Sequence, residues 1–295
     1  MSESTFKQYF LPGKKGFGCL TLRDVPRTKP RLGEILVKIK AVSLNWRDCI
    51  LAVGTYPFPG PDALVPGSDG AGVVEEVGEG VTEWKVGDRV LANFTQDHLA
   101  GRLTRETAFA QLGGEIHGLL GEYFIFPRTG VVRIPAHLSF AEASCLPCAA
   151  LTAWNALYGL SPVRPGQTVV LQGTGGVSTF GLQIAAAAGA TTIVTSSSDA
   201  KLARAAQLGA THCVNYKATP DWAREVQRIT GGRGADHIVE VGGTLTLQDM
   251  LDCFAANQIR PVIGRVFGFE EAREAYEHLW SEAHMGKVVI QASKD

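Results

Sequence analysis

Apolar and polar positions change their spacing along this chain, from short strand-like runs in the first third to alternating strands and helices later. The early runs are rich in β-branched and aromatic residues and are separated by turns such as Gly78-Glu-Gly80. They are Glu34–Val42, Gly70–Val77, Asp88–Ala92 and Glu122–Phe126. This pattern predicts a compact all-β unit.

The pattern changes at Ser139, which with Glu142 has the spacing of a capping box and predicts a helix to about Tyr158. After residue 166, predicted strands occupy Thr168–Gln172, Thr191–Ser196, His212–Val214 and His237–Val241. Helices begin between them near Val177, Asp199 and Asp221. The alternation indicates βαβ units and a parallel sheet. A helix, Glu270–Glu282, and a strand, Lys287–Gln291, follow near the end.

Composition places the chain among ordinary globular proteins. Its 295 residues favour two domains, and 45% are hydrophobic and 19% charged, with a net charge of −1. The near-neutral balance argues against a nucleic-acid partner. No apolar run is long enough for a membrane span, and the first residues lack a signal-peptide core. Six scattered cysteines do not make a secreted disulfide framework, so we expect a cytoplasmic protein.

The first candidate site is a glycine cluster, Gly173-Thr-Gly-Gly-Val-Ser-Thr-Phe-Gly181, between a predicted strand and a predicted helix. Gly173 suits a tight turn, and Gly175 lets the backbone approach a pyrophosphate. The helix that opens near Gly176 and Val177 offers free N–H groups. Ser178 replaces the third glycine of the dinucleotide fingerprint, and its small size should preserve close packing. A plain strand-to-helix turn is the alternative.

Several ordered motifs together resemble the medium-chain dehydrogenase/reductase superfamily of zinc alcohol dehydrogenases and zinc-free quinone and enoyl reductases. They are Gly67-Ser-Asp-Gly-Ala-Gly-Val-Val74, Val86-Gly-Asp-Arg-Val90, Leu151-Thr-Ala-Trp154, Gly173–Gly181, Leu208-Gly-Ala210 and Gly286-Lys-Val-Val289. The resemblance implies a GroES-like β-rich catalytic domain, residues 1–138 and 260–295. A Rossmann domain with a doubly wound parallel sheet, residues 139–259, would be inserted in it. The active cleft is expected between the two domains.

The zinc ligands of the family are not reproduced. The three ligand positions correspond to Asn45, Ser68 and Cys148, of which only the cysteine is a usual zinc ligand. The four cysteines of the structural zinc site are missing as well. Cys145 and Cys148 have the spacing of a redox motif, but two cysteines packed in a core are the better interpretation. We therefore expect no metal.

The expected cofactor is NADP(H) rather than NAD(H). An acidic residue at the end of the second strand would hold the ribose hydroxyls of NAD, but this chain has Ser196 and Ser197 there, with Lys201 one turn later. Hydroxyls and a lysine can bind a 2′-phosphate. Asp199 better suits a helix N-cap. The resemblance to quinone reductases implies that Tyr216 also lies on the phosphate side of the cofactor. The alternative interpretation of the serines and Lys201 is a cluster that caps a helix, with a lysine that only faces solvent.

Resemblance to the zinc-free members also implies the catalytic residues. Asn45 would position a substrate carbonyl, Tyr56 would donate a proton or hydrogen bond, and Thr152 would lie near the nicotinamide. His98 and His117 are interpreted as surface residues. The function expected is NADPH-dependent, zinc-independent hydride transfer to a small quinone, enone, aldehyde or ketone.

The chain departs from the family after the fourth expected strand. A single helix, Gln248–Asn257, leads to Ile259-Arg-Pro-Val-Ile263, so a strand–helix–strand portion is missing and four strands in the order 3-2-1-4 are expected. The fourth strand would become an edge. Many family members form homodimers through the missing sixth strand, which makes the usual dimer doubtful here. The alternative function is therefore a catalytically impaired nucleotide-binding or interaction protein, a shortened isoform of such a reductase.

Overall fold

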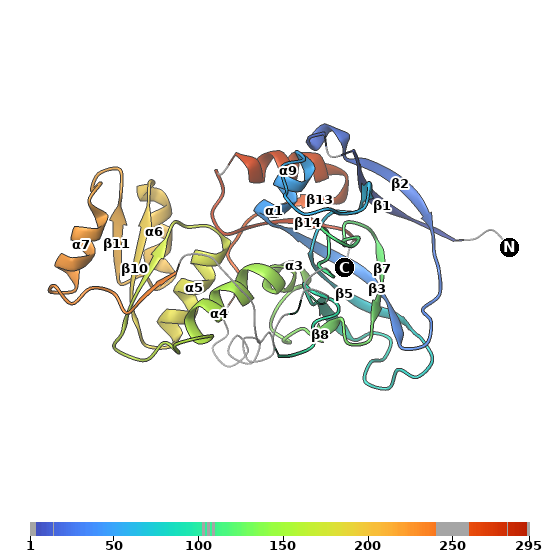
Figure 1. Cartoon of the computed structure of the whole chain (residues 1–295), viewed down its shortest axis with the longest axis horizontal. Helices are drawn as coiled ribbons and strands as arrows, with labels where there is room; N and C mark the ends of the chain where they lie inside the picture. Colours follow the sequence, from blue (N-terminus) through green and yellow to red (C-terminus); the bar gives the residue numbers. More distant parts are fainter. Residues whose placement is uncertain are drawn as a thin grey trace. The chain divides into compact units, whose positions relative to one another are not determined.

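The computed structural model describes residues 4–13, 15–101, 104, 107, 110–239, 260–281 and 283–293. The chain divides into two compact units, whose elements are labelled in Figure 1. The first contains Met1–Cys148, Arg265–His284 and Val288–Asp295, and the second contains Ala149–Gly264 and Met285–Lys287. The first unit thus runs past residue 138, where the sequence motifs placed the boundary, to Cys148.

Two antiparallel sheets form the first unit. The larger has the order β13-β14-β3-β5-β6-β8, with β7 also paired to β3, and the smaller has the order β2-β1-β4. The strands are β1 (Thr5–Pro12), β2 (Thr21–Pro26), β3 (Glu34–Leu44), β4 (Ala63–Leu64), β5 (Asp69–Val77), β6 (Arg89–Ala92), β7 (Tyr123–Pro127), β8 (Val131–Arg133), β13 (Ile263–Gly268) and β14 (Lys287–Gln291). This β-rich unit confirms the GroES-like expectation.

The core of this unit lies against β3 and the helix α9 (Ala272–Trp280). Ala272, Ala275, Tyr276 and Leu279 are buried at the spacing of one helical face, as expected for an amphipathic helix. The described part of this unit also has the short helices α1 (Trp46–Ala52) and α3 (Phe140–Ser144) and the 3-10 turns Phe17–Cys19 and Phe269–Glu271.

The helix expected from Ser139 to Tyr158 begins as predicted but is interrupted. Ser139 and Glu142 form the capping box that starts α3. A π-helical turn, Leu146–Ala150, then separates α3 from α4 (Leu151–Tyr158). Pro147 lies in this turn and has no N–H to continue an α-helical ladder, which explains the break. One continuous helix was therefore a wrong prediction.

Within the described residues, the second unit contains a parallel sheet of four strands, and its order, β11-β10-β9-β12, confirms the expected 3-2-1-4 arrangement. Buried Val170, Ile193 and Val214 pack with Val226 in one cluster. The elements are β9 (Thr168–Gln172), β10 (Thr191–Ser196), β11 (His212–Asn215), β12 (His237–Val239), α5 (Gly176–Ala187), α6 (Asp199–Gln207) and α7 (Trp222–Ile229), drawn from green to orange in Figure 1. This is the α/β Rossmann fold expected from the sequence.

The region in which the chain departs from the family lies outside the described residues. It includes the expected helix Gln248–Asn257 and the last two positions of the strand His237–Val241. Among the described residues β12 pairs only with β9, and Ile238 on it is 56% exposed. No helix in the described ranges has both the length and the apolar character that crossing a membrane requires.

Candidate functional site

The loop that follows β9 has the geometry of an anion site. Gly173 has a φ of +77°, a conformation that glycine adopts without strain. Gly175 is the N-cap of α5 and has no side chain, so no capping side chain occupies the N–H groups of the first turn of this helix. A Cβ built on Gly175 would meet no atom within 4 Å, which leaves space beside the backbone. The predicted phosphate-binding glycines thus lie in one suitable turn.

Close packing between the helix and the sheet depends on Gly181 rather than on residue 178. A Cβ on Gly181 would lie 2.6 Å from Leu171 Cδ2, so this position on α5 tolerates only glycine without a shift. Ser178 instead donates a hydrogen bond from Oγ to the carbonyl of Gln172 at 2.6 Å. The sequence analysis placed the packing role at Ser178, and the structure moves it to Gly181.

Lys287 is a further residue of this loop that the sequence analysis did not single out. Gly286 donates its N–H to the carbonyl of Thr174 at 3.2 Å and forms a bridge with Gly175. The next residue, Lys287, is only 4% exposed, and its stem fills the space above Gly176, where a Cβ would lie 2.7 Å from Lys287 Cδ. A lysine buried to this degree is unusual. The motif containing it, Gly286–Val289, was the signal that could have found it.

The residues expected to select the nucleotide gather where β10 and β11 end. Ser196 Oγ accepts a hydrogen bond from the N–H of Ser198 at 3.4 Å, and the carbonyl of Ser196 accepts one from the N–H of Tyr216 at 3.1 Å. The ring of Tyr216 is 41% exposed. Ser197 is half-buried, as is Lys201 in the first turn of α6. The structure therefore brings Ser196, Ser197 and Tyr216 together at one edge.

Asp199 does not cap α6 as expected. The N-cap is Ser198, whose Oγ accepts a hydrogen bond from the N–H of Lys201 at 3.4 Å. Asp199 is the first residue of the helix, and its carboxylate accepts a hydrogen bond from Asn215 Nδ2 at 2.7 Å. The carboxylate nearest to the strand end is thus engaged by a side chain of the neighbouring strand.

In the first unit, the three positions that correspond to zinc ligands are joined by hydrogen bonds. Asn45 donates from Nδ2 to Ser68 Oγ at 3.3 Å, and Ser68 donates from Oγ to Asp69 Oδ1 at 2.7 Å. The other carboxylate oxygen, Asp69 Oδ2, accepts a hydrogen bond from the backbone N–H of Cys148 at 3.0 Å. Ser68 and Asp69 are both fully buried.

This donor set does not suit a catalytic zinc. Zinc sites in proteins use thiolates, imidazoles and carboxylates, with about three protein ligands. Here an amide and a hydroxyl take two of the three positions, and the one carboxylate is used by Ser68 and Cys148. Among the described residues, no three His, Cys, Asp or Glu side chains are grouped closely enough to hold a metal.

Asn45 is held by its position at the start of α1. Its backbone N–H donates to Asp48 Oδ2 at 2.7 Å, and Asp48 Oδ1 accepts from the N–H of Gly67 at 3.2 Å. Arg47 donates to Gln111 Oε1 at 3.1 Å, and its guanidinium lies 5.9 Å from the centre of the Tyr56 ring. Asn45 and Tyr56 are thus both linked to the first turn of the same helix.

Tyr56 and Thr152 are half-buried, and each belongs to a different unit. Tyr56 follows α1 in the first unit, with its ring edge-on to Phe58 at 5.5 Å between ring centres. Thr152 lies in the first turn of α4 in the second unit. The structure therefore supports the grouping of Asn45 with Tyr56 inside one unit.

Comparison with known proteins identifies the family. The family model described as alcohol dehydrogenase GroES-like domain matches residues 31–136, and the one described as zinc-binding dehydrogenase matches residues 176–271. A zinc-type alcohol dehydrogenase-like protein of Schizosaccharomyces pombe is 42% identical over 323 aligned positions, which cover 91% of this chain and 93% of that protein.

The chain belongs to the medium-chain dehydrogenase/reductase family.

Two solved structures support the same assignment. A Sinorhizobium meliloti protein described as an alcohol dehydrogenase superimposes with a TM-score of 0.90 at 36% identity, covering 99% of each chain. A protein described as an NAD-dependent alcohol dehydrogenase has a TM-score of 0.86 at 31% identity and covers 97% of this chain and all of its own. Medium-chain dehydrogenase/reductases use nicotinamide cofactors, and this chain is an oxidoreductase of that family.

This medium-chain dehydrogenase/reductase is also short. Its alignment with the S. pombe relative extends over 323 positions, more than the 295 residues of the chain, so the alignment leaves gaps in this chain. A length of 295 residues is consistent with the shortened Rossmann domain that the sequence indicated.

Proposed function

We propose that this chain is an NADPH-dependent, zinc-independent oxidoreductase that reduces a small quinone, enone, aldehyde or ketone. The proposal depends chiefly on the hydrogen-bonded network of Asn45, Ser68 and Asp69. Asn45 and Ser68 are two of the three positions that correspond to zinc ligands in the zinc enzymes of the family. The amide and hydroxyl groups there are of the kind that polarises a substrate by hydrogen bonding.

The nucleotide-binding residues fit a dinucleotide phosphate. The open backbone of Gly173 and Gly175, with the N–H groups of Gly176 and Val177, would hold the pyrophosphate, and Lys287 adds a positive charge beside Gly176. Ser196, Ser197, Lys201 and Tyr216 would bind the 2′-phosphate that distinguishes NADPH from NADH. Thr152 would lie beside the nicotinamide. Bound NADPH supplies the hydride.

The catalytic unit would bind and polarise the substrate. Asn45 is positioned by Asp48 through its backbone and by Ser68 through its amide, so its side chain has a fixed orientation from which to hold a carbonyl oxygen. Tyr56 would donate a hydrogen bond or proton as negative charge develops on that oxygen.

The test is steady-state oxidation of NADPH with 9,10-phenanthrenequinone and with trans-2-hexenal, repeated with NADH. We expect turnover that survives extensive dialysis against EDTA and a preference for NADPH. Tyr56→Phe should lower kcat about 100-fold, whereas Tyr158→Phe, a tyrosine of α4, should leave it unchanged.

A second candidate function, a nucleotide-binding protein that has lost catalysis, is favoured by the shortened Rossmann domain. Intrinsic fluorescence titration with NADPH separates the two. Binding without turnover of either substrate would support the second function, and loss of activity on chelation would contradict the absence of zinc.

A further inference from the structure

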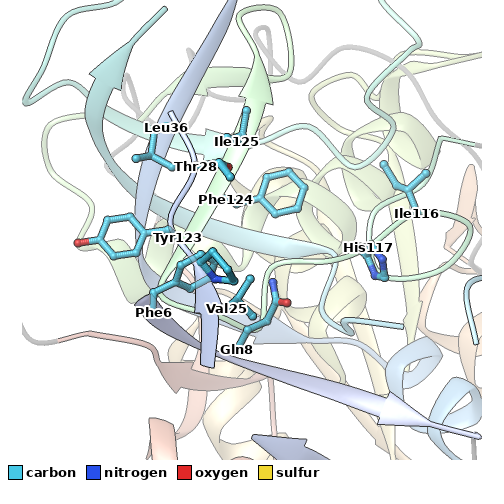
Figure 2. Close-up of a pocket in the computed structure, with 11 residues that line it drawn as sticks. Phe6, Gln8, Val25, Thr28, Leu36, Ile116, His117, Tyr123, Phe124 and Ile125 are labelled. Atoms are coloured by element: carbon cyan, nitrogen blue, oxygen red, sulfur yellow. The ribbon is translucent and has the colours of Figure 1, made fainter. Parts of the chain in front are cut away.

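The two sheets of the first unit are bridged near Gln8, and a cavity lies beside this bridge. Gln8 on β1 forms an isolated antiparallel bridge with Gly121. A side chain at 121 would crowd this contact, since a Cβ there would lie 3.2 Å from Gln8 Cγ. Next to the bridge, β1 and β2 on one side and β3 and β7 on the other line a cavity of ≈ 590 Å³ (Figure 2). This volume is typical of small-molecule sites.

Most of the cavity wall is apolar. Phe6 on β1 pairs directly with Val25 on β2, and the Phe6 ring packs edge-on against Tyr123 with 5.6 Å between ring centres. Leu36, Phe124 and Ile125 from the other sheet complete the apolar part, as Figure 2 shows. Among the described lining residues, none belongs to the proposed catalytic or cofactor sites.

Hydrogen-bond donors gather at the other part of the wall. His117 Nδ1 accepts a hydrogen bond from the N–H of Val65 at 3.2 Å, so the proton of the neutral ring is on Nε2. Partial burial, with the nearby charge of Arg23, lowers the pKa of His117. Gln8 accepts a hydrogen bond on Oε1 from Arg23 Nη2 at 3.1 Å, which leaves its amide N–H groups as the donors on that side chain.

Arg23 is not itself a lining residue, but its hydrogen bond to Gln8 places a positive charge next to this part of the cavity. It is the direct cross-strand neighbour of Gln8, and its guanidinium lies 4.5 Å from the centre of the Phe10 ring. Within the described part of the chain Arg23 has no ion pair, and its buried Nε atom has no hydrogen-bond partner. A cation without an ion pair, next to the hydrogen-bond donors of Gln8 and His117, favours an anionic group at these two residues.

We propose that this cavity binds an amphipathic carboxylate, a molecule with an apolar chain and one carboxylate, at a site separate from the catalytic residues. The apolar chain of the ligand would lie against Phe6, Val25 and Phe124. The carboxylate would accept hydrogen bonds from Gln8 and His117, with the positive charge of Arg23 next to Gln8. The apolar wall favours a ligand with an apolar chain, and the guanidinium of Arg23, which has no ion pair among the described residues, favours a ligand with a negative charge.

Isothermal titration calorimetry with sodium decanoate tests the proposal, and decylamine provides a ligand of similar length and opposite charge. We expect one saturable site for decanoate and at least about tenfold weaker binding of decylamine. Arg23→Gln should weaken decanoate binding about tenfold or more. Arg31→Gln, which removes an exposed arginine outside the cavity, should leave it unchanged.

A second variant tests the location of the site. Val25→Trp fills the cavity with a residue that β-strands accept, and it should abolish decanoate binding. Thermal unfolding and NADPH titration of each variant show whether it remains folded. The proposal is overturned if decanoate gives no saturable heat, if the amine binds equally well, or if a folded Val25→Trp variant still binds decanoate.

Discussion

The buried carboxylate of Asp69 accepts a hydrogen bond of 3.0 Å from the backbone N–H of Cys148. Cys148 belongs to the π-helical turn that Pro147 forces on the chain, where the regular helical ladder is broken. Its N–H is therefore satisfied by a side chain of β5. The same carboxylate holds Ser68, so one acidic residue links the turn to the proposed substrate-binding position.

Asp69→Asn should destabilise the protein. The amide keeps the shape of the carboxylate but turns an N–H₂ group toward one of two donors, Ser68 Oγ or the N–H of Cys148. A buried donor left unpaired costs about 1–3 kcal/mol, measured as the free energy of unfolding in urea. The control is Asp24→Asn, at an exposed position of β2. If both substitutions changed the free energy of unfolding equally, the hydrogen bonds of Asp69 to Ser68 and Cys148 would not stabilise the protein.

Alanine substitutions of Gly175 and Gly181 should affect different properties, NADPH binding in one case and stability in the other. Gly181→Ala places a Cβ 2.6 Å from Leu171 Cδ2, and such overpacking costs about 1–3 kcal/mol of stability. Gly175→Ala meets no protein atom and has a negative φ, so it should unfold like the parent. It should weaken NADPH binding at least about tenfold, because the methyl group occupies the approach to the helix N-terminus.

Urea unfolding and fluorescence titration of the same two variants provide the comparison. The assignment of a packing role to Gly181 and a ligand-approach role to Gly175 fails if both variants lose stability alike. It also fails if Gly175→Ala binds NADPH as the parent does.

The sequence predicts the nucleotide unit better than the catalytic unit. Strands β9 and β10 match their predicted bounds, because buried parallel strands are continuous apolar runs that end at glycine or serine. In contrast, β1 and β2 were not predicted. Their half-buried faces mix Lys7, Gln8 and Arg23 with aromatic residues, so they lack a clear alternation.

The site was predictable where a residue type is unusual for its backbone, and less so where a long-range contact defines it. Gly173 has a positive φ, and a glycine between a predicted strand and a predicted helix indicates such a turn. Asp69 and Lys287 gain their roles from partners far along the chain, Cys148 and Gly176, which no local pattern reveals. The packing glycine was misplaced for the same reason, since only the structure shows how close Leu171 comes to α5.

Replacement of the residues at the ends of β10 and α6 should reverse the nucleotide preference. Ser197→Asp combined with Lys201→Gln introduces a carboxylate that accepts ribose hydroxyls and repels a 2′-phosphate, while it removes the lysine charge. We expect the ratio of NADPH to NADH affinity to fall at least about 100-fold, equivalent to about 2.7 kcal/mol. Arg204→Gln, later on α6, is the control for nonspecific charge loss. An unchanged ratio would argue that these residues only cap the helix.

His117 should make stability depend on pH below neutrality. Its Nδ1 accepts the N–H of Val65, a bond that the doubly protonated ring cannot make, and burial lowers its pKa in the folded state. The unfolded chain, with a pKa near about 6.5, therefore binds the proton more readily. The contribution is complete above that value and is lost as the pH falls through the lowered folded pKa. His117→Gln, which keeps an acceptor without titrating, should flatten the fall in unfolding free energy measured in urea between neutral and mildly acidic pH. His212→Gln, at an exposed position, should leave this fall unchanged. If the unfolding free energy of the parent and of His117→Gln fell equally with pH, the prediction would be contradicted.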